Sequence, residues 1–260
     1  MENEGQIYGH HPVVEAIRSG RAIEKVFFQQ GLRGEVEKEI RHLTREFDIP
    51  LAVIPREKLD RMTNGRHQGV VARLSAIDFH ALDQLLPQVF ERGESPLILV
   101  LDSVTDVRNF GGMARSALCL GAHAAVVPAS GAAPINDDAV KSSAGALLHL
   151  PICRVRSLFS TVEFLQNSGL QVVSLALTPR SVPLPTLDLR EPTALLLGSE
   201  GDGLHPKLLR MSDHTARIPQ SERFDSLNVG VAAGIALYEA ARQRMGFGEI
   251  SKPDPFSSPE

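Results

Sequence analysis

Three polar loops follow short apolar runs in the second half of the chain, and their residue types could act on a bound ligand. The loop after residues 194–197 reads GSEGDG, with Glu200 and Asp202 but no lysine. Its spacing matches neither common glycine-rich phosphate motif, and its carboxylates would repel a phosphate. A loop of backbone amides, carbonyls and carboxylates better suits a cationic ligand without phosphate, such as S-adenosylmethionine with its sulfonium and amino groups.

A second loop follows residues 97–101 and leads into a helix that carries an arginine. Asn109 is the expected N-cap of this helix, and Arg115 falls in its N-terminal half. The helix dipole gives a cation no help at that end. A surface role and a functional role for Arg115 are therefore equally favoured by its position near a strand end.

The third loop follows residues 215–218 and leads into an apolar helix that contains Gly230 and Gly234. Each glycine costs about 1 kcal/mol relative to alanine inside a helix. Ser226 is the expected N-cap, which leaves the nearby Asn228 and the two glycines without a local explanation. We expect the entrance of this helix to belong to a functional site and the glycines to allow close packing.

A regular alternation of apolar runs and helical segments, beginning at residue 96, would position these loops. The runs lie at 97–101, 124–128, 171–177, 194–197 and 215–218. Short apolar strands alternating with helices predict an α/β fold with a parallel sheet covered on both faces. Ligands bind at the carboxyl ends of such strands, so the three loops are expected to meet there.

The front of the chain predicts a smaller α/β unit over residues 1–74. It has expected strands at 25–29 and 69–74, with a helix at 34–47 between them. Residues 75–95 are predicted to be a connector with one short helix. The polar, proline-rich residues 247–260 are expected to be disordered.

A basic stretch near the end of this front unit contains Arg56, Arg61, Arg66 and Arg73. Its charge density alone favours a solvated surface loop. The whole chain carries a net charge of −4, but the first 74 residues carry a net +1 and the remainder a net −5. The overall charge therefore does not indicate nucleic-acid binding, and the distribution is more informative than the total.

The composition is that of an ordinary soluble globular protein, with 43% hydrophobic and 22% charged residues. Cys119 and Cys153 match no metal spacing and no disulfide framework, which predicts a cytoplasmic protein without a metal centre. The acidic, polar beginning is not a secretory signal. No apolar run approaches the roughly 18 residues needed to cross a bilayer, so no membrane partner is expected.

Taken in order, the three loops resemble the motifs of the SpoU branch of the SPOUT methyltransferases, which methylate ribose 2′-hydroxyls of RNA. Each motif is weak alone, but the ordered set is specific and covers residues 96–243. The segment 141–152 is also similar to the middle of that family. The matching residues are Asn109 and Arg115 in the first motif, Gly198, Glu200 and Gly203 in the second, and Ile218, Pro219, Ser226, Leu227, Asn228 and Val229 in the third.

This resemblance implies a SpoU methyltransferase domain at 96–246 with a deep trefoil knot, S-adenosylmethionine as cofactor, and a homodimer. The residues that would contact the cofactor are Leu197, Gly198, Gly203, Ile218 and Leu227. The residues that would line the reacting side are Asn109, Arg115, Glu200, Ser226 and Asn228.

Residues 1–74 are similar to the small domain, related to ribosomal protein L30e, of one subgroup within this branch. That subgroup methylates a guanosine of large-subunit 23S rRNA. The resemblance implies that this domain binds RNA, with Arg56, Arg61, Arg66 and Arg73 as phosphate contacts.

Two departures from the family pattern affect these expectations. Val107 replaces the usual proline of the first motif, and QSERFD replaces a segment that commonly contains glycine. Three alternatives stay open: methylation of a tRNA ribose, a catalytically silent RNA-binding relative, and a nucleotide-dependent α/β enzyme.

Overall fold

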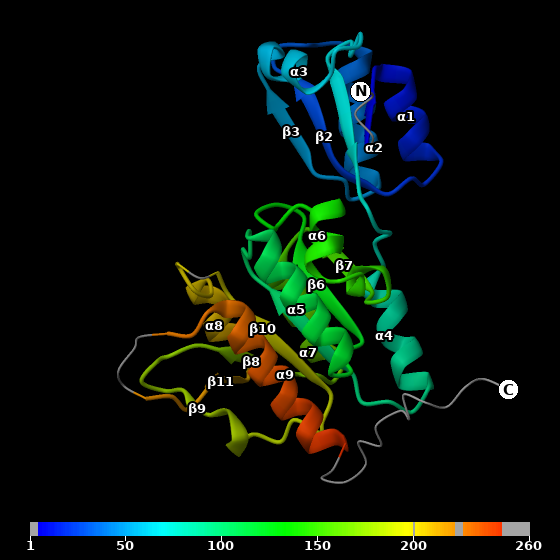
Figure 1. Cartoon of the computed structure of the whole chain (residues 1–260). Coiled ribbons are helices and arrows are strands. Elements are labelled where there is room, and N and C mark those ends of the chain that lie inside the picture. The colour runs from blue at the N-terminus through cyan, green and yellow to red at the C-terminus, as the bar shows by residue number, and fades with distance from the viewer. Residues whose placement is uncertain (1–4, 200, 222–225, 246–260) are drawn as a thin grey trace, which may run out of the picture.

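The chain forms two α/β parts, each with its own sheet and hydrophobic core (Figure 1). The computed structural model describes residues 5–199, 201–221 and 226–245. Among these residues the N-terminal part has a four-stranded sheet and the C-terminal part a seven-stranded sheet. The predicted α/β class is confirmed for both parts.

The N-terminal sheet has the strand order β1-β4-β2-β3, with β3 at one edge. Its only parallel pair in the described structure is β2 with β3, because β4 runs antiparallel to both β1 and β2. The strands are β1 (Gln6–Tyr8), β2 (Ile23–Gln29), β3 (Leu51–Ile54) and β4 (Val70–Leu74). The helices are α1 (His10–Arg18), α2 (Glu35–Glu46) and α3 (Arg56–Met62).

The C-terminal sheet has the order β7-β6-β5-β10-β8-β11-β9, and every pair in it is parallel. Its carboxyl ends therefore all lie at one edge of the sheet. The strands are β5 (Leu97–Leu101), β6 (Ala124–Pro128), β7 (Ile152–Val155), β8 (Gln171–Leu175), β9 (Val182–Pro183), β10 (Thr193–Leu197) and β11 (His214–Arg217).

Helices cover both faces of this sheet, as the continuous apolar strands predict. Along β5, Leu97, Leu99 and Leu101 face one core, while Ile98 and Val100 face the other. The first face is covered by α5 (Val107–Cys119), α6 (Asp137–Ser142), η1 (Ala146–Leu148) and α9 (Val229–Met245). The second is covered by α4 (Leu82–Glu91), α7 (Leu158–Asn167) and α8 (Pro206–Met211). A short turn, η2 (Leu184–Thr186), follows β9.

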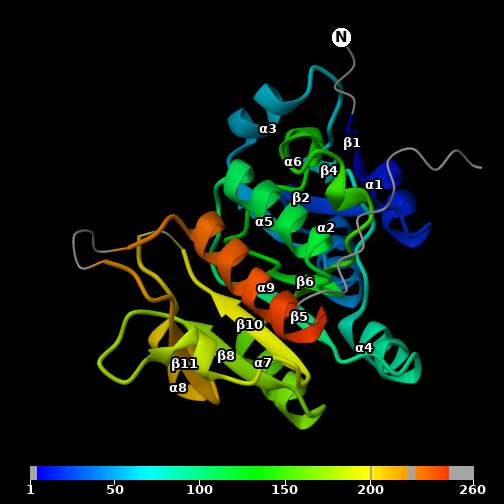
Figure 2. The same ribbon diagram turned by 60° about the horizontal axis from the view of Figure 1, so that its bottom comes forward.

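Helices α5 and α9 lie side by side on the first face, as two views of the ribbon show (Figures 1 and 2). At Gly234, an added Cβ would meet Ser116 Oγ at an ordinary 3.7 Å, so packing does not require that glycine. At Gly230 it would meet Asn228 Oδ1 at 3.1 Å and Asn109 Oδ1 at 3.6 Å. Close packing therefore favours glycine at Gly230, near the start of α9, but not at Gly234.

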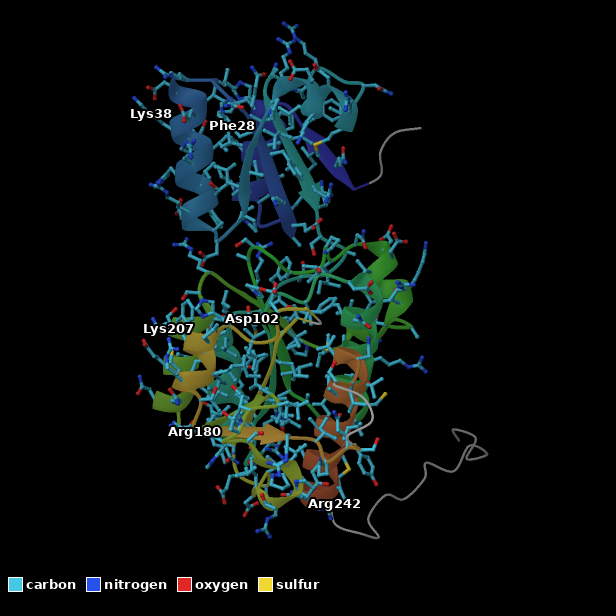
Figure 3. All side chains as sticks on the ribbon, turned by 90° about the vertical axis from the view of Figure 1, so that its left-hand side faces the viewer. Phe28, Lys38, Asp102, Arg180, Lys207 and Arg242 are labelled. Atoms are coloured by element: carbon cyan, nitrogen blue, oxygen red, sulfur yellow. The ribbon has the colours of Figure 1, made fainter. Side chains whose placement is uncertain are left out.

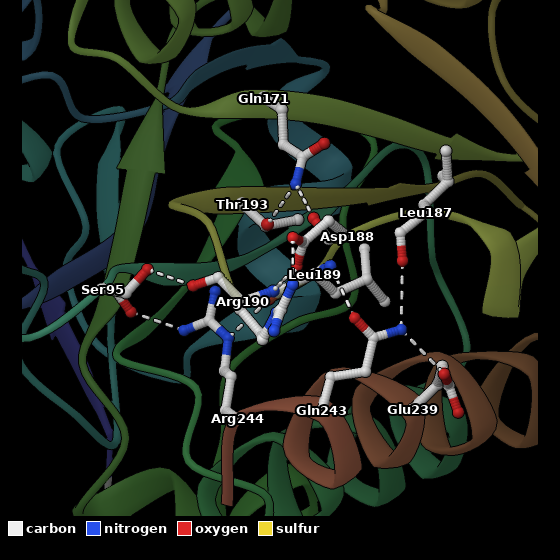
Figure 4. Close-up of polar contacts among 10 residues, drawn as sticks. All are labelled: Ser95, Gln171, Leu187, Asp188, Leu189, Arg190, Thr193, Glu239, Gln243 and Arg244. Atoms are coloured by element: carbon white, nitrogen blue, oxygen red, sulfur yellow. Dashed lines mark hydrogen bonds and ion pairs between the residues drawn. The ribbon is translucent and has the colours of Figure 1, made fainter.

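The far end of α9 is fixed by polar side chains that bind main-chain groups (Figure 4). Gln243 accepts from the Leu189 amide at 2.8 Å and donates to the Leu187 carbonyl at 3.1 Å. The Arg244 guanidinium donates to the carbonyls of Ser95, Pro96, Leu189 and Glu191. These bonds tie the last turn of α9 to the chain just before β5 and β10. The trefoil knot is consistent with this topology and stays a prediction.

Two expected helix caps are wrong. Asp106 caps α5, because its carboxylate accepts from the amides of Arg108 at 2.8 Å and Asn109 at 3.0 Å. Asn109 itself lies in the first helical turn. At α9 the cap is Asn228 rather than Ser226, since its Oδ1 accepts from the amides of Gly230 at 3.0 Å and Val231 at 3.2 Å.

Two further expectations differ from the structure or fall outside it. The basic stretch is not one loop, because Arg56 and Arg61 lie on α3. The expected disordered tail lies outside the described residues.

The two parts are joined by side chains at the end of β7. Arg154 donates to the carbonyls of Ile23 at 2.8 Å and Glu24 at 3.1 Å, and its guanidinium lies 4.0 Å from the Phe79 ring centre. Burial lowers the pKa of this arginine to about 10, which leaves it charged at neutral pH. The neighbouring Arg156 forms an ion pair with Asp48. This contact sets how the two parts face one another.

Candidate active site

A cavity of about 450 Å³ lies at the carboxyl ends of β8, β10 and β11. All three polar loops were expected near strand ends, and two of them, after β10 and β11, line this cavity. The expected cofactor residues that line it are Leu197, Gly198, Gly203, Ile218 and Leu227, together with Ser226 from the expected reacting side.

The loop after β10 is a tight turn that requires glycine at position 198 and favours it at position 203. A Cβ on Gly198 would overlap the backbone of Gly203 and Leu204. Gly203 has φ +66°, in the left-handed region. Ser199 and Gly203 exchange two backbone hydrogen bonds of 3.2 Å, which hold the turn closed. Glu200 lies outside the described residues.

The cavity wall is mostly apolar, with main-chain groups and few charges. Leucines from β8, β10 and α8 supply the apolar surface. Asp202 is a carboxylate of the lining, and the guanidinium of Arg217 is occupied by the Ser181 carbonyl. An apolar cleft with main-chain hydrogen-bonding groups and a carboxylate fits an adenosine bearing a cationic chain, and the closed turn leaves little room for a phosphate cradle.

A second cavity of about 410 Å³ adjoins the first and shares four lining residues with it, namely Ser199, Gly201, Asp202 and Val229. Its remaining wall comes from the loop after β5 and from Gly131 after β6. Hydrogen bonds from the amides of Asn109 and Arg108 lower the pKa of the lining residue Asp106. The described lining contains carboxylates and no lysine, arginine or histidine, so this cavity favours a neutral group that carries hydrogen-bond donors.

The first and third loops meet between the two cavities. Asn228 Nδ2 donates to Asn109 Oδ1 at 3.3 Å, so residues 119 positions apart are in contact. Ser226 lines the first cavity and Asn109 the second. The structure thus locates four of the five expected reacting residues. Asn109, Ser226 and Asn228 lie at or beside the two cavities, and Arg115 lies on α5.

Arg115 does not line either cavity and lies exposed on α5. It forms no hydrogen bond or ion pair within the described part of the chain. An exposed guanidinium without an internal partner is available to a ligand that approaches from outside.

The expected RNA-binding arginines do not form a single cluster. Arg56, Arg61 and Arg66 are exposed, and α3 lies at the end of the N-terminal part away from the large sheet (Figure 1). Arg73 is half-buried on β4, 3.8 Å from Glu24 and 5.2 Å from the centre of the Phe27 ring. Arg56 also has a partner within the chain, since it lies 3.8 Å from Asp60 on the same helix.

Sequence reasoning missed the wall of the second cavity, which includes Ser103, Thr105, Asp106 and Gly131. The position of these residues at the ends of the apolar runs 97–101 and 124–128 was the available signal. Within the described ranges, no helix is long and apolar enough to span a membrane. No cluster of three or more histidine, cysteine or acidic side chains that could hold a metal occurs among those residues.

A sequence profile of the SpoU rRNA methylase family matches residues 96–238, which carry both cavities and all three loops. The chain belongs to the SpoU rRNA methylase family. A second profile, for the substrate-binding domain of RNA 2′-O ribose methyltransferases, matches residues 6–79. Together the two matches span both α/β parts.

Curated and solved relatives of this SpoU family member agree with the profiles. YacO of Bacillus subtilis (strain 168), named as a TrmH family tRNA/rRNA methyltransferase, is 34% identical over 94% of this chain and 97% of its own length. The AdoMet-bound rRNA methyltransferase of Sinorhizobium meliloti is 27% identical with a TM-score of 0.60, covering 93% of this chain and 88% of its own. The SpoU methyltransferase AviRb of Streptomyces viridochromogenes was also solved with AdoMet. It is 27% identical with a TM-score of 0.59, and the match covers 92% of this chain and 90% of AviRb.

Proposed function

We propose that this SpoU family member transfers a methyl group from S-adenosylmethionine to a ribose 2′-hydroxyl of structured RNA, with a guanosine of 23S rRNA as the target. The observation that carries this proposal is a pair of adjoining cavities that share Ser199, Gly201, Asp202 and Val229. The contact of Asn109 with Asn228 lies beside them, since Asn109 lines the second cavity and both chain neighbours of Asn228 line the first. One cavity suits the cofactor and the other suits a neutral nucleoside. The AdoMet bound to two solved relatives supports the choice of cofactor.

The cofactor would be held by Leu197, Gly198, Gly203, Ile218 and Leu227, largely through main-chain groups. Bound there, it supplies an activated methyl group on a sulfonium. The closed turn at Gly198 and Gly203 shapes the floor of the cavity. Asp202, which faces both cavities, would favour a positive charge near their junction.

The chain's own contribution is mainly alignment of the acceptor hydroxyl, a role that can supply roughly 7–11 kcal/mol in enzymes. Asn228 is fixed by its capping bonds and by Asn109, so its amide is held rigidly at the junction. Ser226 and Asn228 would orient the hydroxyl, and Glu200 is assigned to the same reacting side by its motif. A guanidinium stays protonated at neutral pH, so Arg115 would bind an RNA phosphate and stabilise developing negative charge rather than take the proton.

We also propose that the enzyme is a homodimer through α9. Val231, Ile235 and Tyr238 are exposed at spacings of four and three, which place them on one face of the helix. The opposite face, with Ala233, Ala236 and Ala240, is buried in the core. An exposed apolar stripe on a long helix is typical of a protein interface.

Residues 1–74 would serve as the RNA-binding domain, 75–95 as the linker and 96–246 as the methyltransferase domain. Arg56, Arg61 and Arg66, which are exposed, would contact RNA phosphates. The match of residues 6–79 to a substrate-binding domain supports this division of labour.

The proposal is tested by incubating the purified chain with radiolabelled S-adenosylmethionine and unmethylated 23S rRNA or tRNA transcripts. Nuclease digestion and mass spectrometry then identify the methylated nucleoside. We expect 2′-O-methylguanosine from 23S rRNA. A base-methylated product would refute the ribose chemistry. If tRNA is 2′-O-methylated instead, the substrate is tRNA and the proposed rRNA target is wrong. This is the main alternative, because the curated relatives are named tRNA/rRNA methyltransferases.

A further inference from the structure

A basic cleft of about 440 Å³ lies between the two parts of the chain, outside the residues assigned above. It is lined by Lys25 of β2, by Arg41 and Arg45 of α2, and by Arg156 after β7. The sequence motifs point to none of these four side chains. Four cations in one cleft form a site for an anionic polymer.

The charge balance of the cleft favours an anion from outside. Asp48 is the carboxylate in the described lining, and it is paired with Arg156. Arg41 is held by Glu37 at 2.9 Å. Arg45 is exposed, and its guanidinium forms no hydrogen bond or ion pair with the described residues. The Lys25 ammonium lies 5.8 Å from the centre of the Phe27 ring and forms no ion pair with those residues either, although its charge partly opposes the rise in the pKa of Glu24. Two cations of the cleft therefore have no ion-pair partner in the described part of the chain.

The cleft leads toward the second cavity of the candidate active site. Part of its lining is Ala129 and Ser130, which follow the carboxyl end of β6. The next residue, Gly131, lines the second cavity. Three consecutive residues span at most about 10 Å, and a stacked strand rises about 3.4 Å per nucleotide. A strand a few nucleotides long can thus reach from the cleft to the cavity.

The cleft has a fixed shape because the contact between the two parts forms its wall. Arg154 binds the carbonyls of Ile23 and Glu24 on β2, directly beside Lys25. Its neighbour Arg156 binds Asp48, which follows α2. These bonds hold cations from both parts of the chain around one space, so the site is preorganised.

We propose that this cleft binds the phosphates of the RNA strand that flanks the methylated nucleotide. The inference rests on the proposed function and deepens it, since it adds a path by which the strand reaches the site. The second cavity, which has no described cation, would take the nucleoside, while the cleft takes the phosphates next to it. Arg56, Arg61 and Arg66 on the far side of the N-terminal part would contact more distant RNA.

The test compares two double variants of the full chain that remove equal charge. Lys25→Gln with Arg45→Gln removes the two cations of the cleft that have no ion-pair partner among the described residues. Arg33→Gln with Lys38→Gln is the matched control, since both residues are exposed in the same part of the chain and do not line the cleft. Figure 3 shows Lys38 toward the end of the N-terminal part that lies away from the large sheet.

The probe is a fluorescein-labelled single-stranded RNA of mixed sequence, titrated at several salt concentrations. The cleft variant should bind it about tenfold more weakly, and its slope of log affinity against log salt should shrink by about 0.7 per lost contact. The control should change affinity less than twofold. Equal losses in both variants, or an unchanged slope in the cleft variant, would overturn the proposal.

Cofactor binding by calorimetry separates this inference from the proposed function. The cleft variant should bind S-adenosylmethionine as the parent does, because none of its changed residues lines the first cavity. If the parent neither binds the cofactor nor methylates RNA, the proposed function fails. If the parent does both and the cleft variant methylates 23S rRNA at the parent's KM, the cleft proposal alone fails.

Discussion

The side chain of Asn228 donates to the side chain of Asn109 at 3.3 Å and at the same time caps α9 through its oxygen. One amide group therefore both begins a helix and joins two polar loops at the junction of the two cavities. The two roles use different atoms of the same side chain, so a substitution can separate them.

Asn228→Asp should separate the cap from the contact with Asn109. A carboxylate can still accept from the amides of Gly230 and Val231, and it is favoured at a helix N-terminus. It cannot donate to Asn109 Oδ1. We expect near-parental thermal stability with methylation reduced at least tenfold, whereas Asn228→Ala should also lose about 1 kcal/mol of stability. Full activity of the aspartate variant would exclude a role for the donated hydrogen bond.

Gly198→Ala should abolish cofactor binding. The new Cβ would overlap the backbone of Gly203 and Leu204, so the turn that shapes the first cavity must open. Gly112→Ala is the matched control, because a Cβ there meets no atom within 4 Å, needs no unusual backbone angle and lies outside both cavities. Calorimetry with S-adenosylmethionine should show loss of binding in the first variant only. Equal affinity in both variants would place the cofactor elsewhere.

Arg115→Ala should abolish methylation and leave cofactor affinity nearly unchanged. The guanidinium is exposed on α5 and lines neither cavity, so the cofactor does not depend on it. Arg115→Lys keeps the charge but not the planar fork, and should recover part of the activity. Single-turnover methylation and calorimetry on the same preparations check both points. A fully active alanine variant would remove Arg115 from the mechanism.

Ile235→Asp should convert the proposed dimer to a monomer. The change places a charge in the middle of the exposed apolar stripe of α9, where pairing with a second copy would bury it. Phe90→Asp, at an exposed position of α4, is the control and should leave the assembly intact. Light scattering after gel filtration measures the mass. A parent chain that is already monomeric would contradict the interface.

Glu24→Gln should stabilise the chain at neutral pH. Burial raises the pKa of Glu24, although Arg73, Lys25 and Arg154 partly oppose the effect, and its Oε2 has no hydrogen bond within the described structure. Stability from this carboxyl is therefore present below its ordinary pKa and is lost as the pH rises through the raised value.

Thermal unfolding should accordingly show a higher Tm for Glu24→Gln at about pH 7.5, with the gap closing near pH 4. The exposed Glu163→Gln on α7 serves as the reference and should not change the Tm at either pH. A lower Tm for the Glu24 variant at neutral pH would mean that attraction to the three cations outweighs desolvation.

Strands buried on both faces were predictable from sequence because their apolar runs are continuous. The predicted bounds of β5 and β6 match the structure, while β8 ends two residues earlier than expected. Strand β7 was missed because its four residues, ICRV, include Arg154, which serves the contact between the two parts. Charge within a short strand hides the pattern on which such predictions depend.

The helix N-caps show a second limit of prediction from the sequence. Asp106 and Asn109 are both good capping residues, and so are Ser226 and Asn228. Which of the two residues caps the helix depends on the path of the chain between the preceding strand and the helix. The residue types alone do not determine that path. The contact of Asn109 with Asn228 likewise follows from α5 packing against α9, which only the three-dimensional fold determines.

The anchoring of α9 at Gln243 and Arg244 has a consequence for chain synthesis. The helix presents Asn228 at its first turn and is tied down by its last, 16 residues later. A growing chain that has not yet released Arg244 from the ribosome cannot make the bonds to Ser95, Pro96 and Glu191. The helix that carries Asn228 is thus fixed only once Gln243 and Arg244 can reach these main-chain groups, and a chain cut before Gln243 would lack the anchor.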